Sequence, residues 1–462
     1  MNIKIFVTGL LLALLVGLAA CGTAEETEDV VHEEIAPEEI LEAEIYEEEI
    51  IEEAYEPDMS DIAEASPAPE IEITVLDFNN YEEEMVARNH LFAELSALER
   101  YNPERIEEME NLTMFFGDVR MRFTYEIRGE APENGHALFI ALHGGGGVPQ
   151  FVNEQQFQHM QIYYRDSVQE GIYVAVRGVR DTWNTHFNYE SFPLYDRLIE
   201  NMILFYDIDP NRVYLLGFSA GGDGVYGITP RMADRFAAVS MSAGHHNWVN
   251  PINFKHTPII LQCGDSDTAF YRHIETVNFG EVMRDLGYTF ALNMHVNMPH
   301  NFFDNVPASA PQRVWADPFA WRDGEASDII EIDTNSVRFL KQFTREPLPD
   351  EIAWHLGTRA DMRSVESFYW LRAGFDVNDG VIRALLDRDA NAISIQTDEY
   401  VSGAFYILLN RQMVDFDTPV ILDVNGNISE VAVTSSADIL LETTIERLDP
   451  NFQFTAMIRI EV

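Results

Sequence analysis

A serine flanked by two glycines is the residue most suggestive of chemistry in this sequence. Residues 213–222 read V-Y-L-L-G-F-S-A-G-G, so an apolar run typical of a strand leads into Gly217, Ser219 and Gly221. This is the G-x-S-x-G pattern, in which a sharp turn from strand to helix lifts the serine hydroxyl clear of the backbone. Such a hydroxyl becomes a good nucleophile only when a base removes its proton. The pattern predicts a nucleophile at Ser219, and the alternative is a glycine-rich turn without a catalytic role.

A nucleophilic serine needs a base and an acid that orients it, and both candidates follow predicted strands. The apolar run ending at Gln262 is followed by Asp265 and Asp267, and the run ending at Val296 is followed by His300. In open parallel sheets, active sites form at the carboxyl ends of the strands. His300 is therefore the candidate base. Either aspartate could orient it and stabilise its charged form, so both remain candidates at this point.

A run of four glycines follows another predicted strand. His143 precedes Gly144 to Gly147 directly after the apolar run 137–142. Consecutive glycines allow backbone amides to approach a substrate closely. We expect an amide of Gly144 or Gly145, together with that of Ala220, to form an oxyanion hole. The alternative is a flexible loop.

The elements around these residues alternate between short apolar strands and amphipathic helices. Strands are expected at 137–142, 172–176, 213–216, 237–241, 258–262 and 290–296, and helices at 151–169, 192–206, 271–286 and 336–343. A helical pattern at 81–110 and an antiparallel edge strand at 119–127 precede them. Alternation of this kind predicts an α/β fold with a mostly parallel, doubly wound sheet covered on both faces.

The sequence resembles the α/β-hydrolase superfamily, especially secreted esterases of the polyhydroxybutyrate-depolymerase, feruloyl-esterase and dienelactone-hydrolase type. The stretches that carry the resemblance are 142–147, 209–222 and 235–239. It covers residues 115–343 and implies a catalytic triad in the chain order Ser219, Asp267, His300. It also implies an enzyme that needs no cofactor.

The resemblance also chooses between the two aspartates. The family's acid commonly lies three residues after a glycine at a strand end, which from Gly264 selects Asp267 over Asp265. The family's histidine often precedes a polar residue and an aromatic one, as His300 does here. Pro299 departs from the pattern, because the family often has glycine at that position.

Three further residues are weaker candidates for the substrate pocket. Trp183 follows the predicted strand 172–176, and His245 and His246 follow the predicted strand 237–241. An ordinary core role for the tryptophan and a structural loop role for the histidines are the alternatives. We expect no metal site, because no metal-ligand spacing such as H-E-x-x-H is present.

The N-terminal part predicts export and a lipid anchor. An apolar run at 5–20 leads to Leu18-Ala19-Ala20-Cys21-Gly22, which resembles a bacterial lipobox and implies lipidation of Cys21. A plain secretory signal is the alternative. The predicted organisation is a signal peptide with its lipobox cysteine at 1–21, a disordered acidic stalk at 22–70, a catalytic domain at 71–346 and a C-terminal β-rich domain at 347–462.

The net charge of the chain is −48, with 78 acidic residues against 30 basic ones. Half of this excess lies before Arg88, in the part that contains the predicted stalk, and half after it. A nucleic-acid-binding protein normally presents a basic footprint, so nucleic acid is an unlikely partner on these grounds. The charge favours solubility and repulsion from anionic surfaces.

Together these patterns predict an exported, membrane-anchored serine hydrolase that cleaves small or polymeric carboxylic esters, with carbohydrate esters included. An exopeptidase of the same fold is one alternative, because peptide cleavage uses the same triad. The other is a non-catalytic surface lipoprotein for carbohydrate binding or adhesion, which the stalk and the β-rich domain would suit.

Overall fold

The computed structural model describes residues 2–3, 73–357, 367–375, 377 and 379–462. The predicted signal peptide, Cys21 and the acidic stalk lie outside the described residues, apart from Asn2 and Ile3. These two residues form the short strand β1 (Asn2–Ile3), which pairs with β2 (Ile73–Thr74). No helix among the described residues combines the length and apolar character required to cross a membrane.

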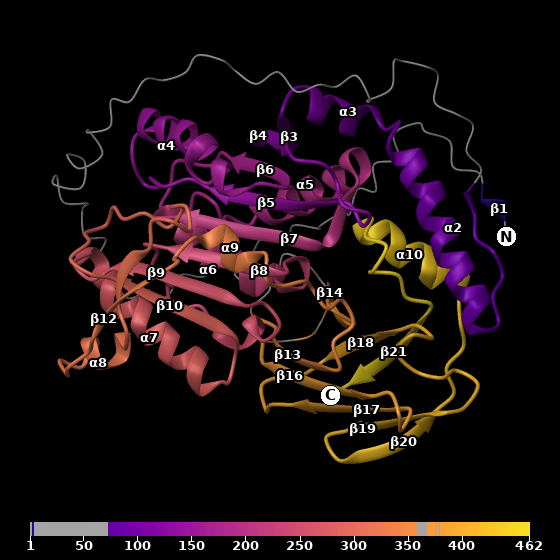
Figure 1. Cartoon of the computed structure of the whole chain (residues 1–462). Coiled ribbons are helices and arrows are strands. Elements are labelled where there is room, and N and C mark those ends of the chain that lie inside the picture. Colours follow the sequence, from indigo (N-terminus) through magenta and orange to yellow (C-terminus); the bar gives the residue numbers. More distant parts are fainter. Residues whose placement is uncertain (1, 4–72, 358–366, 376, 378) are drawn as a thin grey trace, which may run out of the picture. The chain divides into compact units, whose positions relative to one another are not determined.

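A large sheet with helices on both sides forms the centre of the structure (Figure 1). Its strands are β3 (Thr113–Phe116), β4 (Val119–Arg128), β5 (His136–Leu142), β6 (Gly171–Val176), β7 (Ile208–Phe218), β8 (Ala238–Ser242), β9 (Ile259–Gly264), β10 (Phe290–His295), β11 (Gln312–Trp315) and β12 (Ile329–Ile332). The helices of this part are α2 (Tyr81–Glu99), α3 (Pro103–Glu110), α4 (Gln150–Tyr163), α5 (Ser191–Tyr206), α6 (Ala220–Met232), α7 (Arg272–Asp285), α8 (Pro318–Arg322) and α9 (Ser336–Leu340).

The strand order confirms the predicted fold class. Across the sheet the order is β12-β11-β10-β9-β8-β7-β5-β6-β4-β3, and the six strands from β10 to β6 run parallel. After β5 the chain moves to one side to form β6 and then returns to form β7 on the other side of β5. This reversal is a topological switch point, where doubly wound sheets bind their ligands.

Different helices cover the two faces of the sheet. On β5, Leu138 and Ile140 pack into a core shared with α5, α6 and α7. The intervening Phe139 and Ala141 pack into a second core, which is shared with α4 and α9. Because successive strand residues point to opposite faces, a strand buried on both sides is apolar at every position. That is why the run 137–142 could be recognised in the sequence.

Three details differ from the sequence-based expectations. The helical pattern at 81–110 is two helices, because Asn102 caps a new helix whose first residue is Pro103. The antiparallel strand β4 is not at the edge, since β3 pairs along its outer side. The residues Asp209-Pro210-Asn211, whose sequence is typical of a turn, lie inside β7, where the register against β5 shifts between His136 and Leu138.

The C-terminal part contains two smaller sheets with their own hydrophobic core. One has the order β13-β16-β17-β19-β20 and the other β14-β15-β18-β21. Their strands are β13 (Glu351–His355), β14 (Ser367–Phe368), β15 (Leu371–Ala373), β16 (Val381–Asp387), β17 (Ala392–Thr397), β18 (Ala404–Leu409), β19 (Val420–Val424), β20 (Asn427–Val431) and β21 (Ala456–Glu461). Strands β19 and β20 form a hairpin whose turn residues Asn425 and Gly426 are both at positive φ.

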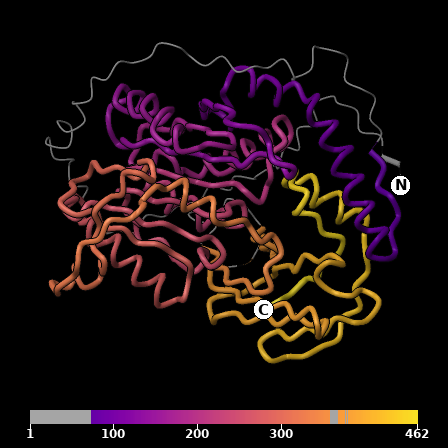
Figure 2. The backbone as a smooth tube through the Cα atoms, in the orientation of Figure 1, coloured from indigo at the N-terminus to yellow at the C-terminus, as the bar shows by residue number. Residues whose placement is uncertain are grey.

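One helix in this part was not predicted from the sequence. Helix α10 (Ala437–Arg447) packs beside α2 from the other end of the chain, as the tube of Figure 2 also shows. Leu440 of α10 and Leu91 of α2 are fully buried in their shared core.

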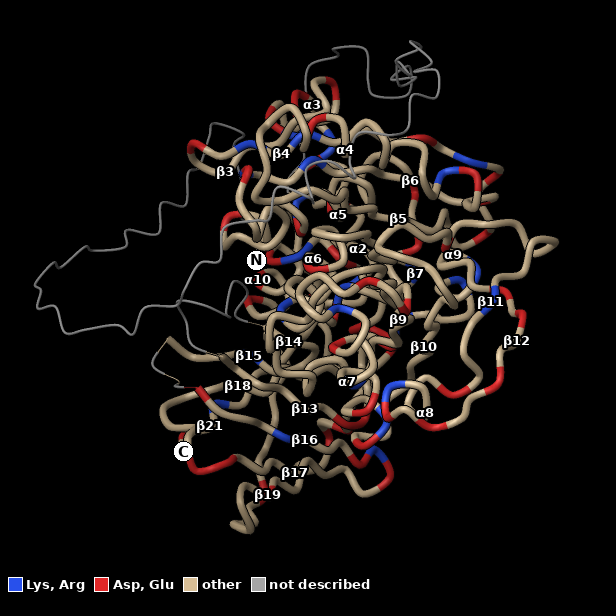
Figure 3. The backbone as a smooth tube through the Cα atoms, turned by 90° about the vertical axis from the view of Figure 1, so that its left-hand side faces the viewer, with Lys and Arg blue, Asp and Glu red and all other residues tan. Residues whose placement is uncertain are grey.

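Lys and Arg are spread among acidic residues over many elements, and the view in Figure 3 shows no continuous basic band.

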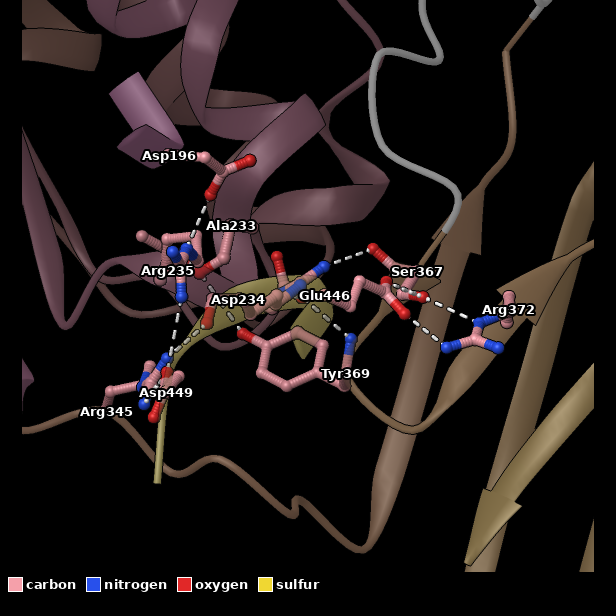
Figure 4. Close-up of polar contacts among 12 residues, drawn as sticks. Asp196, Ala233, Asp234, Arg235, Arg345, Ser367, Tyr369, Arg372, Glu446 and Asp449 are labelled. Carbon is pink, nitrogen blue, oxygen red and sulfur yellow. Dashed lines mark hydrogen bonds and ion pairs between the residues drawn. The ribbon is translucent and has the colours of Figure 1, made fainter. Parts of the chain in front are cut away.

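Buried ion pairs connect the C-terminal part to the end of α6, the helix that begins after Ser219 (Figure 4). Asp234 accepts hydrogen bonds from the Arg447 guanidinium and from the backbone amide of Tyr369. Its neighbour Arg235 donates to Asp196 at 2.7 Å and lies 3.4 Å from Asp449. All four charged side chains of the two pairs Asp234–Arg447 and Arg235–Asp449 are almost completely buried.

We expect Arg447→Met to lower the free energy of unfolding by about 3–5 kcal/mol, because it leaves the buried Asp234 carboxylate without its ion-pair partner. Urea unfolding followed by circular dichroism measures this change. Arg459→Met is the matched control: Arg459 pairs with Glu461 but is 52% exposed, so the loss should stay below about 1 kcal/mol. Equal effects of the two substitutions would contradict a structural role for the buried pair.

Candidate active site

Ser219 stands at a strained turn between β7 and α6. Its φ is 58° and its ψ is −122°, a conformation that side chains rarely adopt. The glycines on either side are required by close backbone approach. A Cβ on Gly217 would lie 2.1 Å from the Gly221 carbonyl oxygen, and a Cβ on Gly221 would lie 2.0 Å from that of Leu142. The turn is also fastened to β8, because the Ser219 amide donates to the Ser242 carbonyl at 2.9 Å.

The structure brings Ser219, His300 and Asp267 together in one hydrogen-bonded series. His300 Nε2 lies 2.9 Å from Ser219 Oγ, and His300 Nδ1 lies 2.7 Å from Asp267 Oδ2. The strand register explains why Asp267 and His300 meet. His295 at the end of β10 pairs with Gly264 at the end of β9, so the segments that follow these two parallel strands begin at the same edge of the sheet. With Nδ1–H donating to the carboxylate, Nε2 is free to accept the serine proton.

Of the two candidate acids, only Asp267 contacts His300. The Asp265 carboxylate instead accepts a hydrogen bond from Trp315 Nε1 at 3.0 Å. Asp267 is 1% exposed, and the guanidinium of Arg272 lies 3.7 Å from its Oδ1. A positive group at this distance offsets part of the cost of burying the carboxylate. Arg272, the first residue of α7, lies five residues after Asp267 and was not predicted as part of the site.

The predicted oxyanion residues lie against the serine. A Cβ built on Gly144 would be 3.3 Å from Ser219 Cβ, so this residue packs directly on Ser219. The amide of Gly146 donates to Asn153 Oδ1, whereas the described part of the chain shows no backbone partner for the amides of Gly144 and Gly145. Ala220 is the first residue of α6, where amides have no partner within the helix. These donors can therefore serve an oxyanion beside Ser219.

A buried histidine holds the glycine loop in place. The Gly178 amide donates to His143 Nε2 at 3.0 Å, so the proton of the neutral ring is on Nδ1, which donates to the Gly144 carbonyl at 2.5 Å. Burial, aided by the positive charges of Arg177 and Arg122, lowers the pKa of His143 to about 3. His143 is thus a neutral structural residue that fixes the orientation of the loop.

The weaker pocket candidates all lie at the same edge of the sheet as Ser219. The backbone of Trp183 covers the glycine loop, with its carbonyl oxygen 3.3 Å from the Cβ position of Gly146. His245 donates its amide to the buried Asp223, and His246 Nε2 bonds Glu275 at 3.0 Å. Burial lowers the pKa of His245. The two histidines are therefore engaged in their own loop, and their role as substrate contacts stays a prediction.

Exposed aromatic side chains follow several of the parallel strands. Trp183 follows β6, Trp248 follows β8, Tyr271 follows β9 and Phe303 follows β10. Trp248 is 82% exposed and has a positive φ of 54°. The signal that the sequence offers is an aromatic residue after the end of each of these four strands. No group of three or more metal-ligand side chains suited to an ion occurs among the described residues.

The pKa of His143 predicts a contribution to acid sensitivity. Its folded-state pKa lies below its unfolded value of about 6.5, so between these values the unfolded chain binds a proton that the folded chain excludes. The free energy of unfolding should therefore fall as the pH falls below about 6.5. We expect His143→Gln to make this decline shallower by up to about 1.4 kcal/mol per pH unit.

Urea titrations at several pH values between 6.5 and 5 measure the two slopes. Identical slopes for the wild type and His143→Gln would show that His143 does not exclude the proton.

No protein-family model matches the chain, and no curated protein matches its sequence. Among solved structures, it is similar to a thermostable esterase, with a TM-score of 0.35 and 16% identity, over 50% of this chain and 62% of that one. It is also similar to a ferulic acid esterase from Anaeromyces mucronatus (TM-score 0.30, 15% identity, 41% and 83% covered). A third neighbour is an acylaminoacyl peptidase from Pyrococcus horikoshii (TM-score 0.31, 16% identity, 41% and 36% covered). With TM-scores this low, the neighbours add no support to the site, which depends on its own geometry.

Proposed function

We propose that this protein is a serine hydrolase that cleaves carboxylic esters, with Ser219 as nucleophile, His300 as general base and Asp267 as the acid that orients His300. The observation that carries the proposal is the continuous series of hydrogen bonds from Asp267 through His300 to Ser219. The strained backbone at Ser219 supports it, because such strain concentrates at functional sites.

In the proposed reaction, His300 Nε2 takes the proton of Ser219 Oγ as the oxygen attacks the ester carbonyl carbon. The carbonyl oxygen becomes negatively charged and is stabilised by the amides of Ala220 and of Gly144 or Gly145. His300 then gives its proton to the departing alcohol, which leaves an acyl group on Ser219. Water, activated by His300 in the same way, releases the acid and restores the serine.

The proposed substrate is a small or polymeric carboxylic ester, with carbohydrate esters included. The half-buried serine and the 26% exposed His300 side chain make the reacting atoms accessible from solvent. Trp183, whose backbone lies over the glycine loop, is a proposed contact for the substrate. The same groups could act on a peptide bond, so ester and amide substrates must be compared directly. No step requires a cofactor.

We also propose that the chain is a bacterial lipoprotein, exported and anchored to the cell membrane by lipid on Cys21. The lipobox-like sequence Leu18-Ala19-Ala20-Cys21 supports this proposal. The acidic segment 22–70 would then separate the catalytic part from the anionic membrane surface, because like charges repel.

We expect Ser219→Ala to lower kcat for p-nitrophenyl esters by about a million-fold, since no other hydroxyl occupies the nucleophile position. It should also abolish labelling by a fluorophosphonate probe, and His300→Ala should do the same. Ser266→Ala is the matched control: this serine lies beside Asp267 but its hydroxyl bonds only Asp265. Labelling of Ser219→Ala at the wild-type rate would contradict the mechanism, and faster cleavage of aminoacyl p-nitroanilides than of esters would favour the peptidase.

We expect the full chain, expressed in a bacterial host fed an alkyne analogue of palmitate, to acquire the analogue at Cys21. Thiolate chemistry makes the cysteine the acceptor, so Cys21→Ser should lose the label and leave the membrane fraction. Cys263→Ser, at the buried second cysteine, is the control and should keep both. A labelled Cys21→Ser protein would rule out Cys21 as the attachment site.

A further inference from the structure

A buried carboxylate lies in the segment that follows β10, and hydroxyl groups surround it. Asp304 is completely buried, and its Oδ1 accepts a hydrogen bond from Tyr163 at 2.9 Å. Its Oδ2 accepts from Tyr164 at 2.7 Å, from Ser336 at 2.9 Å and from Ser242. Four neutral donors come from three different elements, α4, α9 and β8. Burial raises the pKa of this carboxyl, and the four hydroxyl donors oppose the rise.

The segment that carries Asp304 also carries His300. Between them, Phe302 packs against Phe218 at 5.3 Å and is stacked on the buried His295 at 4.4 Å, measured between ring centroids. Beyond them, the Asn305 side-chain amide donates to the Tyr163 carbonyl. Among the residues that hold this segment, namely Phe302, Asp304 and Asn305, Asp304 is the one with an acidic side chain. In the sequence it follows Phe302, whereas His300 precedes Phe302. The bonds of Asp304 therefore fix the far end of the segment that begins at His300.

The same carboxylate is connected to the nucleophile. Ser242 ends β8 and donates its hydroxyl to Asp304, while its backbone carbonyl accepts the Ser219 amide at 2.9 Å. Ser242 also pairs with Phe218 in the register of β7 and β8. One serine thus joins the strained turn at Ser219 to the carboxylate that holds the segment of His300.

We propose that Asp304 is a positioning residue that keeps His300 Nε2 in register with Ser219 Oγ. This inference rests on the function proposed above. A buried charge is costly unless its hydrogen bonds are satisfied, and a fully satisfied polar network is rigid. The reacting atoms gain from such rigidity, because a displacement of about 1 Å can cost about a hundred-fold in rate.

The test compares Asp304→Asn with the wild type, using p-nitrophenyl ester turnover and the rate of fluorophosphonate labelling well below the melting temperature. The substitution keeps the shape of the side chain but removes one acceptor atom and the charge. We expect kcat and the labelling rate to fall together by about 10- to 100-fold, with KM within about threefold of the wild type. A purely structural role would lower the melting temperature and leave both rates of the folded protein unchanged.

Two milder variants and one control complete the experiment. Ser242→Ala and Tyr164→Phe each remove one hydroxyl, and each should lower kcat by a smaller factor without changing KM. The double variant Ser242→Ala/Asp304→Asn should be no slower than Asp304→Asn alone, because both changes act through one network. Asp265→Asn is the control: this carboxylate is close to the triad but does not contact His300, so kcat should stay within about threefold of the wild type.

The outcomes are distinguishable. A folded Asp304→Asn protein with wild-type kcat, or an equal loss in Asp265→Asn, overturns the positioning role and leaves the proposed function intact. If Asp304→Asn does not fold, unchanged kcat in both Ser242→Ala and Tyr164→Phe overturns the role. A wild-type protein that neither labels nor turns over any ester overturns the proposed function, and the positioning role with it.

Discussion

The strained backbone at Ser219 is the constraint on which the rest of the site depends. A residue in such a sparsely populated conformation costs about 1–3 kcal/mol and persists only when its surroundings determine it completely. Here the surroundings are the parallel neighbours of β7. Leu142 at the end of β5 lies against Gly221, and Ser242 at the end of β8 holds the Ser219 amide. Leu142 leaves room only for glycine at position 221, and Gly221 in turn leaves room only for glycine at position 217, so the turn and the sheet specify one another.

Buried polar groups, rather than apolar packing alone, hold the loops at this edge of the sheet. His143 fixes the glycine loop with one donated and one accepted hydrogen bond, and Asp304 collects four hydroxyl groups below the segment of His300. A buried group with an unsatisfied hydrogen bond would cost more than an apolar side chain of the same size. In both places the bonds are made to backbone or hydroxyl partners with defined geometry, and this geometry selects one loop conformation.

The sequence was sufficient to predict the parallel strands of the large sheet and the residues after them, because both follow from local patterns, whereas the strands β3, β11 and β12 were not predicted. Apolar runs such as 137–142 are recognisable without any knowledge of partners, and Ser219, Asp267 and His300 each follow such a run. Asp304 was not predicted, because its proposed role depends on hydrogen bonds from four hydroxyl groups that are adjacent only in the folded chain, those of Tyr163, Tyr164, Ser242 and Ser336. Helix α10 was missed for a related reason: it packs in a core shared with α2, more than 300 residues earlier.

Buried ion pairs connect the C-terminal sheets to the region of α6, the helix that follows Ser219. The ion pair between Asp234 and Arg447 lies at the end of the helix whose first turn contains Ala220. A helix held at both ends keeps its N-terminal amides in a fixed direction, which is what stabilisation of an oxyanion requires. An independent binding module would instead meet its neighbour through few contacts and a flexible linker. The buried pairs, and the packing of α10 against α2, favour a C-terminal part that supports the helix following Ser219.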